Sequence, residues 1–403
     1  MSAWYFGLGY FGAGISWVHV SIAEFGGLPL FASVFLMLLL CGYLAIFPAL
    51  TFNVLARFFK RQYWPLAIGF IWLAMEFLRA RLLSGFPWLS IGYSQADSPF
   101  SHFMPLIGEI GLSAIIVTVC MSMAIGLQQK RYILSAIPLL VLATLSISLS
   151  QVSWTTKSGE SRKIALIQGN IPQSMRFEPE RDIPTMEKYL RLTDPYWDHD
   201  VIIWPEAAVP RLEIMVQDYL LHLDKKATES NTGLITGVVD YDLDTDIAHN
   251  ALLALGIDKD VNSTPYRYQH SKRFAKHHLL PIGEFVPFED LLRPLAPIFD
   301  LPMSSFSRGD YVQPNLTAGN TQFVPAICFE IAFPRQIDAN IQNASDMIIT
   351  VSNDAWFGDS HGPHQHLQIA QVRAKEFGLP VIRATNNGIT AIIDHHGIIV
   401  QRL

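Results

Sequence analysis

The sequence is short of charge. Asp, Glu, Lys and Arg make up 16% of its 403 residues, against roughly 25% in soluble globular proteins. The deficit is concentrated in residues 1–156, which hold four acidic and seven basic side chains of the 35 and 29 in the chain. The first part is therefore an apolar, slightly basic segment. The second part, residues 157–403, has the acidic composition of an ordinary globular domain.

Cysteine is scarce as well, with Cys41, Cys120 and Cys328 the three in the chain. The first two lie in long apolar runs, so no disulfide framework is indicated. A free cysteine in an apolar run usually packs as a small hydrophobic side chain. Cys328, in the stretch PAICFEIAFP, therefore needs further evidence before it is assigned a reactive role.

The first part has long uncharged runs in place of charge, each long enough to cross about 30 Å of hydrocarbon. They cover residues 1–23, Leu30–Ala56, Ile110–Leu127 and Tyr132–Ser150, and we count the shorter run Trp64–Met75 as a fifth span. Several such runs without a basic N-terminal region argue against a cleaved signal peptide as the only explanation. A membrane domain of about five spans is expected.

The basic residues predict how these spans are oriented. Arg57, Lys60 and Arg61 lie between the second and third spans, and Lys130 and Arg131 between the fourth and fifth. The positive-inside rule places both loops in the cytoplasm. Five crossings then bring residue 157 and everything after it to the outer side of the membrane.

Two acidic residues, Glu76 and Glu109, fall in or beside these spans. An ionisable group at membrane depth is expensive and often functional, but either glutamate can instead lie near the interface. The loop Gly85–Trp88 leaves two interpretations open as well. Its aromatic residues suit an interfacial belt, and they equally suit the mouth of a lipid-binding site.

From residue 163 onward the pattern is that of an α/β domain. Short runs that are apolar at every position suit strands of a sheet covered on both faces. The expected strands are Ile164–Gln168, Val201–Trp204, Gly233–Val239, Phe323–Ile327 and Met347–Ser352, and helices are expected around Pro184–Leu192, Gln217–Ser230 and His366–Phe377.

Reactive side chains follow three of these strands. Glu206 comes after VIIWP, Cys328 after FVPAI, and Ser352–Asp354 after MIITV. Ligand sites of open α/β sheets gather beyond the carboxyl ends of the strands, so we expect these residues to converge. A glutamate after Trp-Pro can alternatively cap a helix.

Several motifs carry a resemblance to a known family. The chain resembles the nitrilase superfamily, and more narrowly the bacterial apolipoprotein N-acyltransferases, in which such a domain is attached to membrane helices. The matching stretches are IWPE (203–206), LPIGEFVP (280–287), CFE (328–330), SNDAWFG (352–358), GNIPQS (169–174), RATNNGITA (383–391), GFPWL (85–89) and GYSQ (92–95). The resemblance implies a multi-span α-helical membrane domain over 1–156 and an α/β nitrilase-like four-layer αββα sandwich over 157–403. Against the family pattern, the chain is expected to lack the first and last membrane helices and the final strands.

The resemblance also implies a site. The family's Glu–Lys–Cys triad falls on Glu206, Lys276 and Cys328, through which an acyl chain passes as a thioester from a phospholipid to an apolipoprotein amine. The same comparison implies supporting roles for Glu284, Phe329 and Glu330, with the Phe329 N–H helping Lys276 to hold the oxyanion, and substrate contacts from Phe86, Trp88, Phe177 and Asn353. Phe329 and Phe177 stand where the family commonly has Tyr and Trp, so the polar hydroxyl and indole N–H groups of those residues are absent here.

The partners and location follow from the same resemblance. Phosphatidylethanolamine is the expected acyl donor and an apolipoprotein the acceptor, at a bacterial inner membrane with the α/β domain on the periplasmic side. No cofactor and no nucleic acid is expected. The histidines of HGPHQH, His361, His364 and His366, suggest a metal site, but their spacing fits no familiar zinc pattern, so no metal is expected either. Two alternatives stay open: a membrane-tethered amidase that uses water, and a shortened, inactive acyltransferase homologue.

Overall fold

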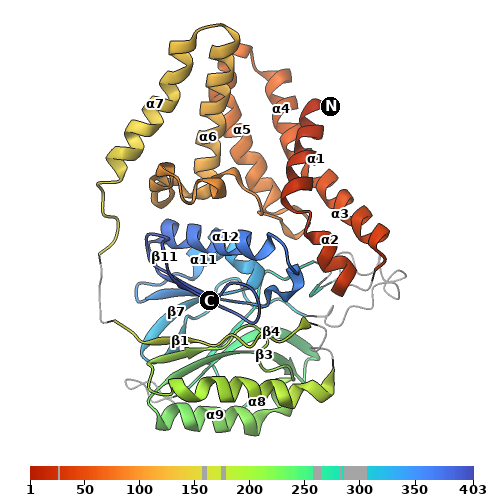
Figure 1. The fold of residues 1–403 in the computed structure, drawn as a ribbon, viewed down its shortest axis with the longest axis vertical. Helices are drawn as coiled ribbons and strands as arrows, with labels where there is room; N and C mark the ends of the chain where they lie inside the picture. The colour runs from red at the N-terminus through yellow and green to blue at the C-terminus, as the bar shows by residue number, and fades with distance from the viewer. Residues whose placement is uncertain (26–27, 157–160, 174–177, 257–264, 282, 286–305) are drawn as a thin grey trace. The chain divides into compact units, whose positions relative to one another are not determined.

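The computed structural model describes residues 1–403 except 26–27, 157–160, 174–177, 257–264, 282 and 286–305 (Figure 1). The chain divides into two compact units. The helical unit comprises Met1–Ala23, Leu28–Lys157 and Gln371–Gly378, and the α/β unit comprises Glu24–Gly27, Ser158–Ala370 and Leu379–Leu403. Figure 1 draws the helices of the first unit in red to yellow and most of the second in green to blue.

The helical unit is built from the apolar runs. Its α-helices are α1 (Ser2–Gly14), α2 (Val18–Val20), α3 (Leu30–Leu44), α4 (Ile46–Phe58), α5 (Trp64–Arg79), α6 (Met104–Gln128) and α7 (Tyr132–Leu149). Three stretches of the described chain are long and apolar enough to cross a membrane, namely Leu30–Phe58, Pro99–Gln128 and Tyr132–Leu149, and the segment around α1 and α2, bent by 63°, makes a fourth if it counts as one span. The helix α5, which contains the expected span Trp64–Met75, has 16 residues and is not among these stretches. The expected number of five spans therefore stays a prediction.

Glu76 and Glu109, the two acidic residues that fall in or beside the expected spans, are buried and paired. Glu76 is bonded to Arg79 one turn further along α5, and Glu109 Oε1 lies 3.6 Å from Nη2 of Arg373, which also pairs with Glu376 at 3.0 Å. An arginine partner offsets much of the cost of burying a carboxylate. The two acidic residues therefore belong to the internal packing of the helical unit.

The α/β unit contains two sheets. The first has the order β1 (Ile164–Leu166), β2 (Val201–Ile203), β3 (Gly233–Asp242), β4 (Ile247–Leu255) and β5 (Arg273–Ala275), and the second has the order β11 (Ile399–Arg402), β10 (Ala391–Ile393), β9 (Val381–Thr385), β8 (Met347–Ser352), β7 (Thr321–Ile327) and β6 (Leu316–Ala318). The strands β1, β2 and β3 run parallel, as do β7, β8 and β9. The parallel strands of each sheet thus present their carboxyl ends at one edge.

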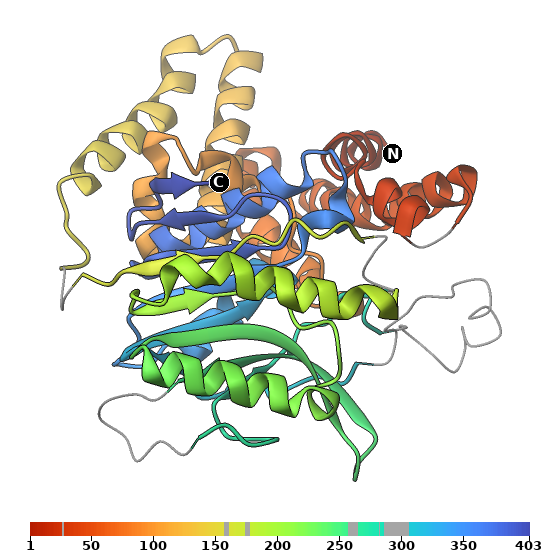
Figure 2. The ribbon, with the colours of Figure 1, turned by 60° about the horizontal axis from the view of Figure 1, so that its bottom comes forward.

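The two sheets pack face to face. Val201 and Ile203 of β2 share one core with Ile349 and Val351 of β8. The alternate residues of β2 point the other way, so that Ile202 belongs to the core under α8 (Asp182–Thr193) and α9 (Gln217–Glu229). Figure 2 shows these two helices lying over the first sheet. The helix α11 (Pro334–Asn340) and the first part of α12 (Gly362–Phe377) cover the second sheet (Figure 1). The predicted two-sheet α/β sandwich is confirmed.

Candidate active site

Glu206 lies just beyond the carboxyl end of β2. The residue after it, Ala207, has a φ of +47°, which turns the chain sharply and brings the glutamate back over the sheet edge. Its carboxylate is buried and accepts hydrogen bonds from Nδ2 of Asn250 at 2.7 Å and from the N–H of Asn353 at 3.1 Å, besides the one from Lys276 described below. Glu206 is therefore held in one position by groups from both sheets, and it does not cap a helix.

Lys276 follows β5 directly and is only 2% exposed. Its Nζ lies 2.9 Å from the Glu284 carboxylate and 3.5 Å from Oε1 of Glu206. Burial acts to lower the pKa of Lys276, but the negative charges of Glu284 and Glu206 outweigh it and hold the pKa above its ordinary value. The buried side chain is therefore a permanent ammonium at neutral pH.

Cys328 directly follows β7 and begins a short 3-10 helix, Cys328–Ala332, with a φ of +53°. The side chain is half-buried. Burial raises the pKa of the thiol, the charge of Glu206 raises it further, and the ammonium of Lys276 acts in the opposite direction. Both charges reach the sulfur because the three side chains converge on one region. The net result is a thiol that keeps its proton in the resting protein.

Glu284 and Asn250 complete the surroundings of the ammonium. Asn250 donates through Nδ2 to both carboxylates, at 2.7 Å to Glu206 and 2.8 Å to Glu284. Glu284 also accepts the N–H of Leu280 at 2.8 Å. The second carboxylate is thus anchored to its own loop and fixes where Lys276 lies. This geometry suits the orienting role expected for Glu284.

Glu330 is a buried carboxylate that joins two chain segments. It accepts the backbone N–H of Ile327 at 2.8 Å, the N–H of His277 at 2.7 Å and Nε2 of Gln336 at 2.8 Å. One bond therefore goes to the residue before the cysteine and one to the residue after Lys276. Glu330 ties the segment carrying the amine to the segment carrying the thiol.

Asn353, expected to contact substrate, is occupied with internal bonds. Its Nδ2 donates to Gln173 at 2.6 Å, its Oδ1 accepts from Asn386 at 2.8 Å, and its backbone N–H holds Glu206. The geometry places it in the framework of the site. Its contact with substrate stays a prediction.

The other expected substrate residues lie elsewhere or are not described. Phe177 lies outside the described residues. Phe86 and Trp88 belong to the helical unit, where Trp88 is 2% exposed and contacts Trp17 with ring centroids 5.8 Å apart. A side chain so buried in the protein does not have the exposure of an interfacial belt residue. Its role toward substrate stays a prediction.

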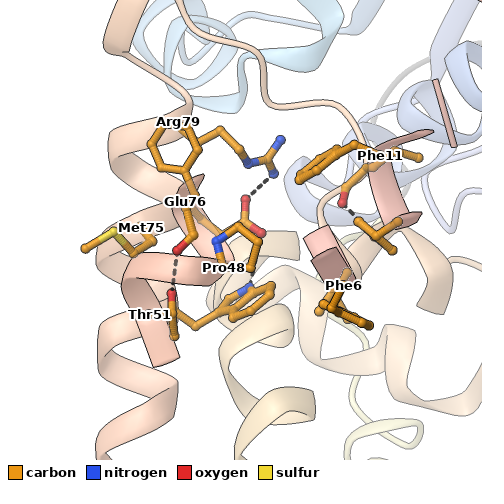
Figure 3. Close-up of a pocket in the computed structure, with 12 residues that line it drawn as sticks. Phe6, Phe11, Pro48, Thr51, Met75, Glu76 and Arg79 are labelled. Carbon is orange, nitrogen blue, oxygen red and sulfur yellow. Dashed lines mark hydrogen bonds and ion pairs between the residues drawn. The ribbon is translucent and has the colours of Figure 1, made fainter. Parts of the chain in front are cut away.

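The loop that carries these two rings is held by Arg79. Its Nη1 donates to the carbonyl oxygens of Phe86 and Trp88, both at 2.6 Å, while Nη2 binds Glu76. Figure 3 shows Arg79 and Glu76 at the edge of a pocket between the helices, lined otherwise by mostly apolar residues such as Phe6 and Phe11. The guanidinium thus fixes the loop through its main chain.

A second group of buried polar residues includes Asp354, which was expected at the strand ends, and two partners, His366 and Arg383, that were not assigned to the site. Asp354 and His366 lie beside the cysteine turn and are bonded to each other and to Arg383. Arg383 and His366 hold the pKa of Asp354 at about 2 despite burial, and burial lowers the pKa of His366. The signals were present, because Asp354 and Arg383 fall in matched motifs and the histidines of HGPHQH were expected to be loop and helix-start residues near the site rather than metal ligands. Across the described ranges, no three or more His, Cys, Asp or Glu side chains are grouped to hold a metal ion.

The comparisons with known proteins agree with this fold. The carbon-nitrogen hydrolase family matches residues 163–403, which places the α/β unit in that class of enzymes. The apolipoprotein N-acyltransferase N-terminal domain matches residues 1–122. The chain is 49% identical over 408 residues to the apolipoprotein N-acyltransferase of Shewanella oneidensis, covering 99% of this chain and 78% of that one. It is 47% identical over 406 residues to that of Vibrio cholerae, covering 100% and 79%. The chain belongs to the apolipoprotein N-acyltransferase family and is a membrane protein.

Proposed function

We propose that this chain moves an acyl group from a phospholipid, phosphatidylethanolamine in particular, to the α-amine of the lipidated N-terminal cysteine of an apolipoprotein. The observation that carries the proposal is the buried Lys276 ammonium between Glu206 and Glu284, with both Lys276 and Glu206 acting on the Cys328 thiol. Membership of the family supplies the substrates. Donor and acceptor are both anchored in lipid, which agrees with a catalytic unit attached to apolar helices.

The first half-reaction forms a thioester. Glu206 takes the thiol proton while the sulfur of Cys328 attacks the carbonyl carbon of the phospholipid ester. The oxyanion that forms is stabilised by the Lys276 ammonium and the N–H of Phe329. When the tetrahedral intermediate collapses, the ester C–O bond breaks and Glu206 returns the proton to the departing lysophospholipid alkoxide. The acyl group is left on sulfur.

The second half-reaction regenerates the enzyme. The apolipoprotein amine attacks the thioester carbonyl, and the same two donors hold the oxyanion. The C–S bond then breaks, the amide is released, and the amine proton passes through Glu206 back to the sulfur. Because the resting thiol is protonated, each cycle begins and ends in the same protonation state. No redox partner or cofactor enters the balance.

The placement in the membrane is part of the proposal. The basic loops around Arg57–Arg61 and Lys130–Arg131 favour the cytoplasm under the positive-inside rule, so a multi-pass inner-membrane protein with a periplasmic catalytic unit follows. Phe86, Trp88, Phe177 and Asn353 are proposed to line the path of the acyl chains and the acceptor.

The test is a mass measurement on the full chain in phosphatidylethanolamine vesicles with a labelled acyl chain. We expect an acyl adduct on Cys328, and an N-acylated product once a diacylglyceryl-cysteine peptide is added. The variant Cys328→Ala should form no adduct, whereas Cys120→Ala, which removes an exposed cysteine, should form it normally. An adduct that yields only fatty acid after the peptide is added would favour the membrane-tethered amidase. Absence of any adduct would identify an inactive homologue.

A further inference from the structure

His366 contacts the main chain of the nucleophile residue. The ring lies on α12, is fully buried, and places Nε2 at 3.1 Å from the carbonyl oxygen of Cys328. A carbonyl oxygen can only accept a hydrogen bond, so Nε2 carries the proton whatever the charge of the ring. The bond therefore runs from the histidine to the cysteine carbonyl.

The other side of the ring is fixed by a buried ion pair. Nδ1 of His366 lies 3.1 Å from Oδ1 of Asp354 and 3.1 Å from Nη2 of Arg383. Arg383 in turn binds Asp354 at 2.5 Å, and the Ser352 hydroxyl donates to the same carboxylate. All four side chains are buried. With Nε2 donating to the Cys328 carbonyl, Nδ1 of a neutral ring accepts from Nη2 of Arg383, and Nδ1 of a protonated ring donates to Asp354. In either state the ring is held from both sides.

The carbonyl that His366 holds belongs to the peptide between Cys328 and Phe329. This unit is planar and trans, so its N–H points in the direction opposite to its C=O. Fixing the carbonyl therefore fixes the direction of the Phe329 N–H. Cys328 also has a φ of +53°, a conformation that is strained for a non-glycine residue and persists only when its surroundings impose it.

We propose that His366 is a positioning residue for acyl transfer, which holds the Cys328 carbonyl so that the Phe329 N–H is aimed at the oxyanion. The inference rests on the proposed function, because it assigns the geometry of one of the two oxyanion donors. A hydrogen bond accepted by the carbonyl also polarises the peptide and makes its N–H a stronger donor. Asp354 and Arg383 act through His366 by keeping the ring in place.

The experiment compares two reactions of the same sulfur in a Cys120→Ala background. Acylation by phosphatidylethanolamine develops an oxyanion, whereas alkylation by iodoacetamide does not. We expect His366→Leu to slow adduct formation from the lipid about 10- to 100-fold, somewhat less than the 10²- to 10³-fold cost of removing an oxyanion donor outright. The alkylation rate should change less than threefold. His366→Gln, whose amide N–H reaches a similar position, should recover much of the acylation rate.

The control is His364→Leu, which makes the same change at an exposed residue of the same helix and should leave both rates as in the parent. Equal loss of both rates in His366→Leu, with no recovery in His366→Gln, would show a merely structural role and overturn the inference. So would an unchanged acylation rate. Failure of the proposed function is seen separately, because the parent chain would then form no adduct from the lipid while still reacting with iodoacetamide.

Discussion

The Lys276 Nζ lies 3.5 Å from Oε1 of Glu206, although 70 residues separate the two in the chain. Glu206 follows β2, an inner strand of the first sheet, and Lys276 follows β5, a strand at the edge of the same sheet. Between them, the Asn250 amide of β4 binds Glu206 and also Glu284, the second partner of the ammonium. The site is thus an arrangement of one cation and two carboxylates that share a single amide.

Removing the cation should leave two buried carboxylates without their counterion. We expect Lys276→Met to lower the free energy of unfolding by about 3–5 kcal/mol, as found when one partner of a buried ion pair is deleted. The double variant Lys276→Met, Glu284→Gln should recover part of that loss, because one of the two charges is gone, and still form no acyl adduct. Urea titration in detergent and mass analysis measure the two effects. A double variant that acylates normally would contradict the role given to Lys276.

Replacing Glu206 should change two reaction rates of Cys328 in opposite directions: alkylation should become faster and acylation by the lipid slower. The negative charge of Glu206 is one cause of the raised pKa of Cys328. In Glu206→Gln the thiol should therefore ionise at lower pH, and iodoacetamide should react faster at mildly alkaline pH. Acylation by the lipid should instead fall about 10²- to 10⁴-fold, because the general base is lost.

The measurement is a pH profile of alkylation in a Cys120→Ala background, set beside the rate of adduct formation. In the unsubstituted site we expect alkylation to keep rising through the alkaline range, since a raised pKa makes the thiolate a minor species at neutral pH. Glu229→Gln, an exposed acid on α9, serves as the control and should leave both measurements unchanged. An unchanged pH profile in Glu206→Gln would argue against an electrostatic effect of Glu206 on the thiol.

Neutralising Glu330 should loosen the connection between the two reactive segments. Glu330→Gln places an amide N–H₂ against a site built only of donors, from Ile327, His277 and Gln336. We expect a loss of about 1–3 kcal/mol in the free energy of unfolding, the usual cost of leaving buried polar groups unpaired. Urea titration measures it, with the exposed Glu178→Gln as control. Equal free energies of unfolding for Glu330→Gln and Glu178→Gln would show that Glu330 does not hold the two segments together.

Changing Arg79 to lysine should release the aromatic loop while keeping the charge. A lysine ammonium cannot hold the carbonyls of Phe86 and Trp88 and the Glu76 carboxylate in the fixed fork that a guanidinium provides. We expect Arg79→Lys to lower the thermal midpoint of the chain in detergent and to expose the loop to limited proteolysis. Arg81→Lys, two residues further on and exposed, should do neither. Similar cleavage in both variants would contradict this role for Arg79.

Much of the fold was predictable, because it depends on local pattern. The runs that predicted strands around Val201–Trp204, Phe323–Ile327 and Met347–Ser352 are strands β2, β7 and β8. Among the described residues the sequence analysis missed the strands β4, β5, β6, β9, β10 and β11. Three of them, β5, β6 and β10, have three residues each, too few to show a period. The run 1–23 shows a different limit, because a bend of 63° breaks it after Gly14. Glycine is a common site for a helix to end, but hydropathy alone predicted one continuous span.

The candidate site was predictable from strand ends and from motifs. Glu206 and Cys328 were selected because they follow predicted strands, and Lys276 through motif order. Asn250 was not selected, since a single asparagine within the apolar strand β4 has no motif around it. His366 was noticed for its neighbours His361 and His364, which directed attention to metal ligation. Its contact with the Cys328 carbonyl depends on how α12 packs against the second sheet. That packing cannot be predicted from the spacing of residues in the sequence.

The sequence by itself determined that an apolar helical segment precedes an acidic α/β domain, because hydropathy and charge are summed along the chain and need no partner. It also identified which residue types carry the chemistry. Only the tertiary structure decided that the ammonium lies between two carboxylates, that the thiol keeps its proton, and that a histidine holds the cysteine carbonyl. Those properties come from burial and from distances of about 3 Å between residues far apart in the chain, which exist only once the two sheets have packed together.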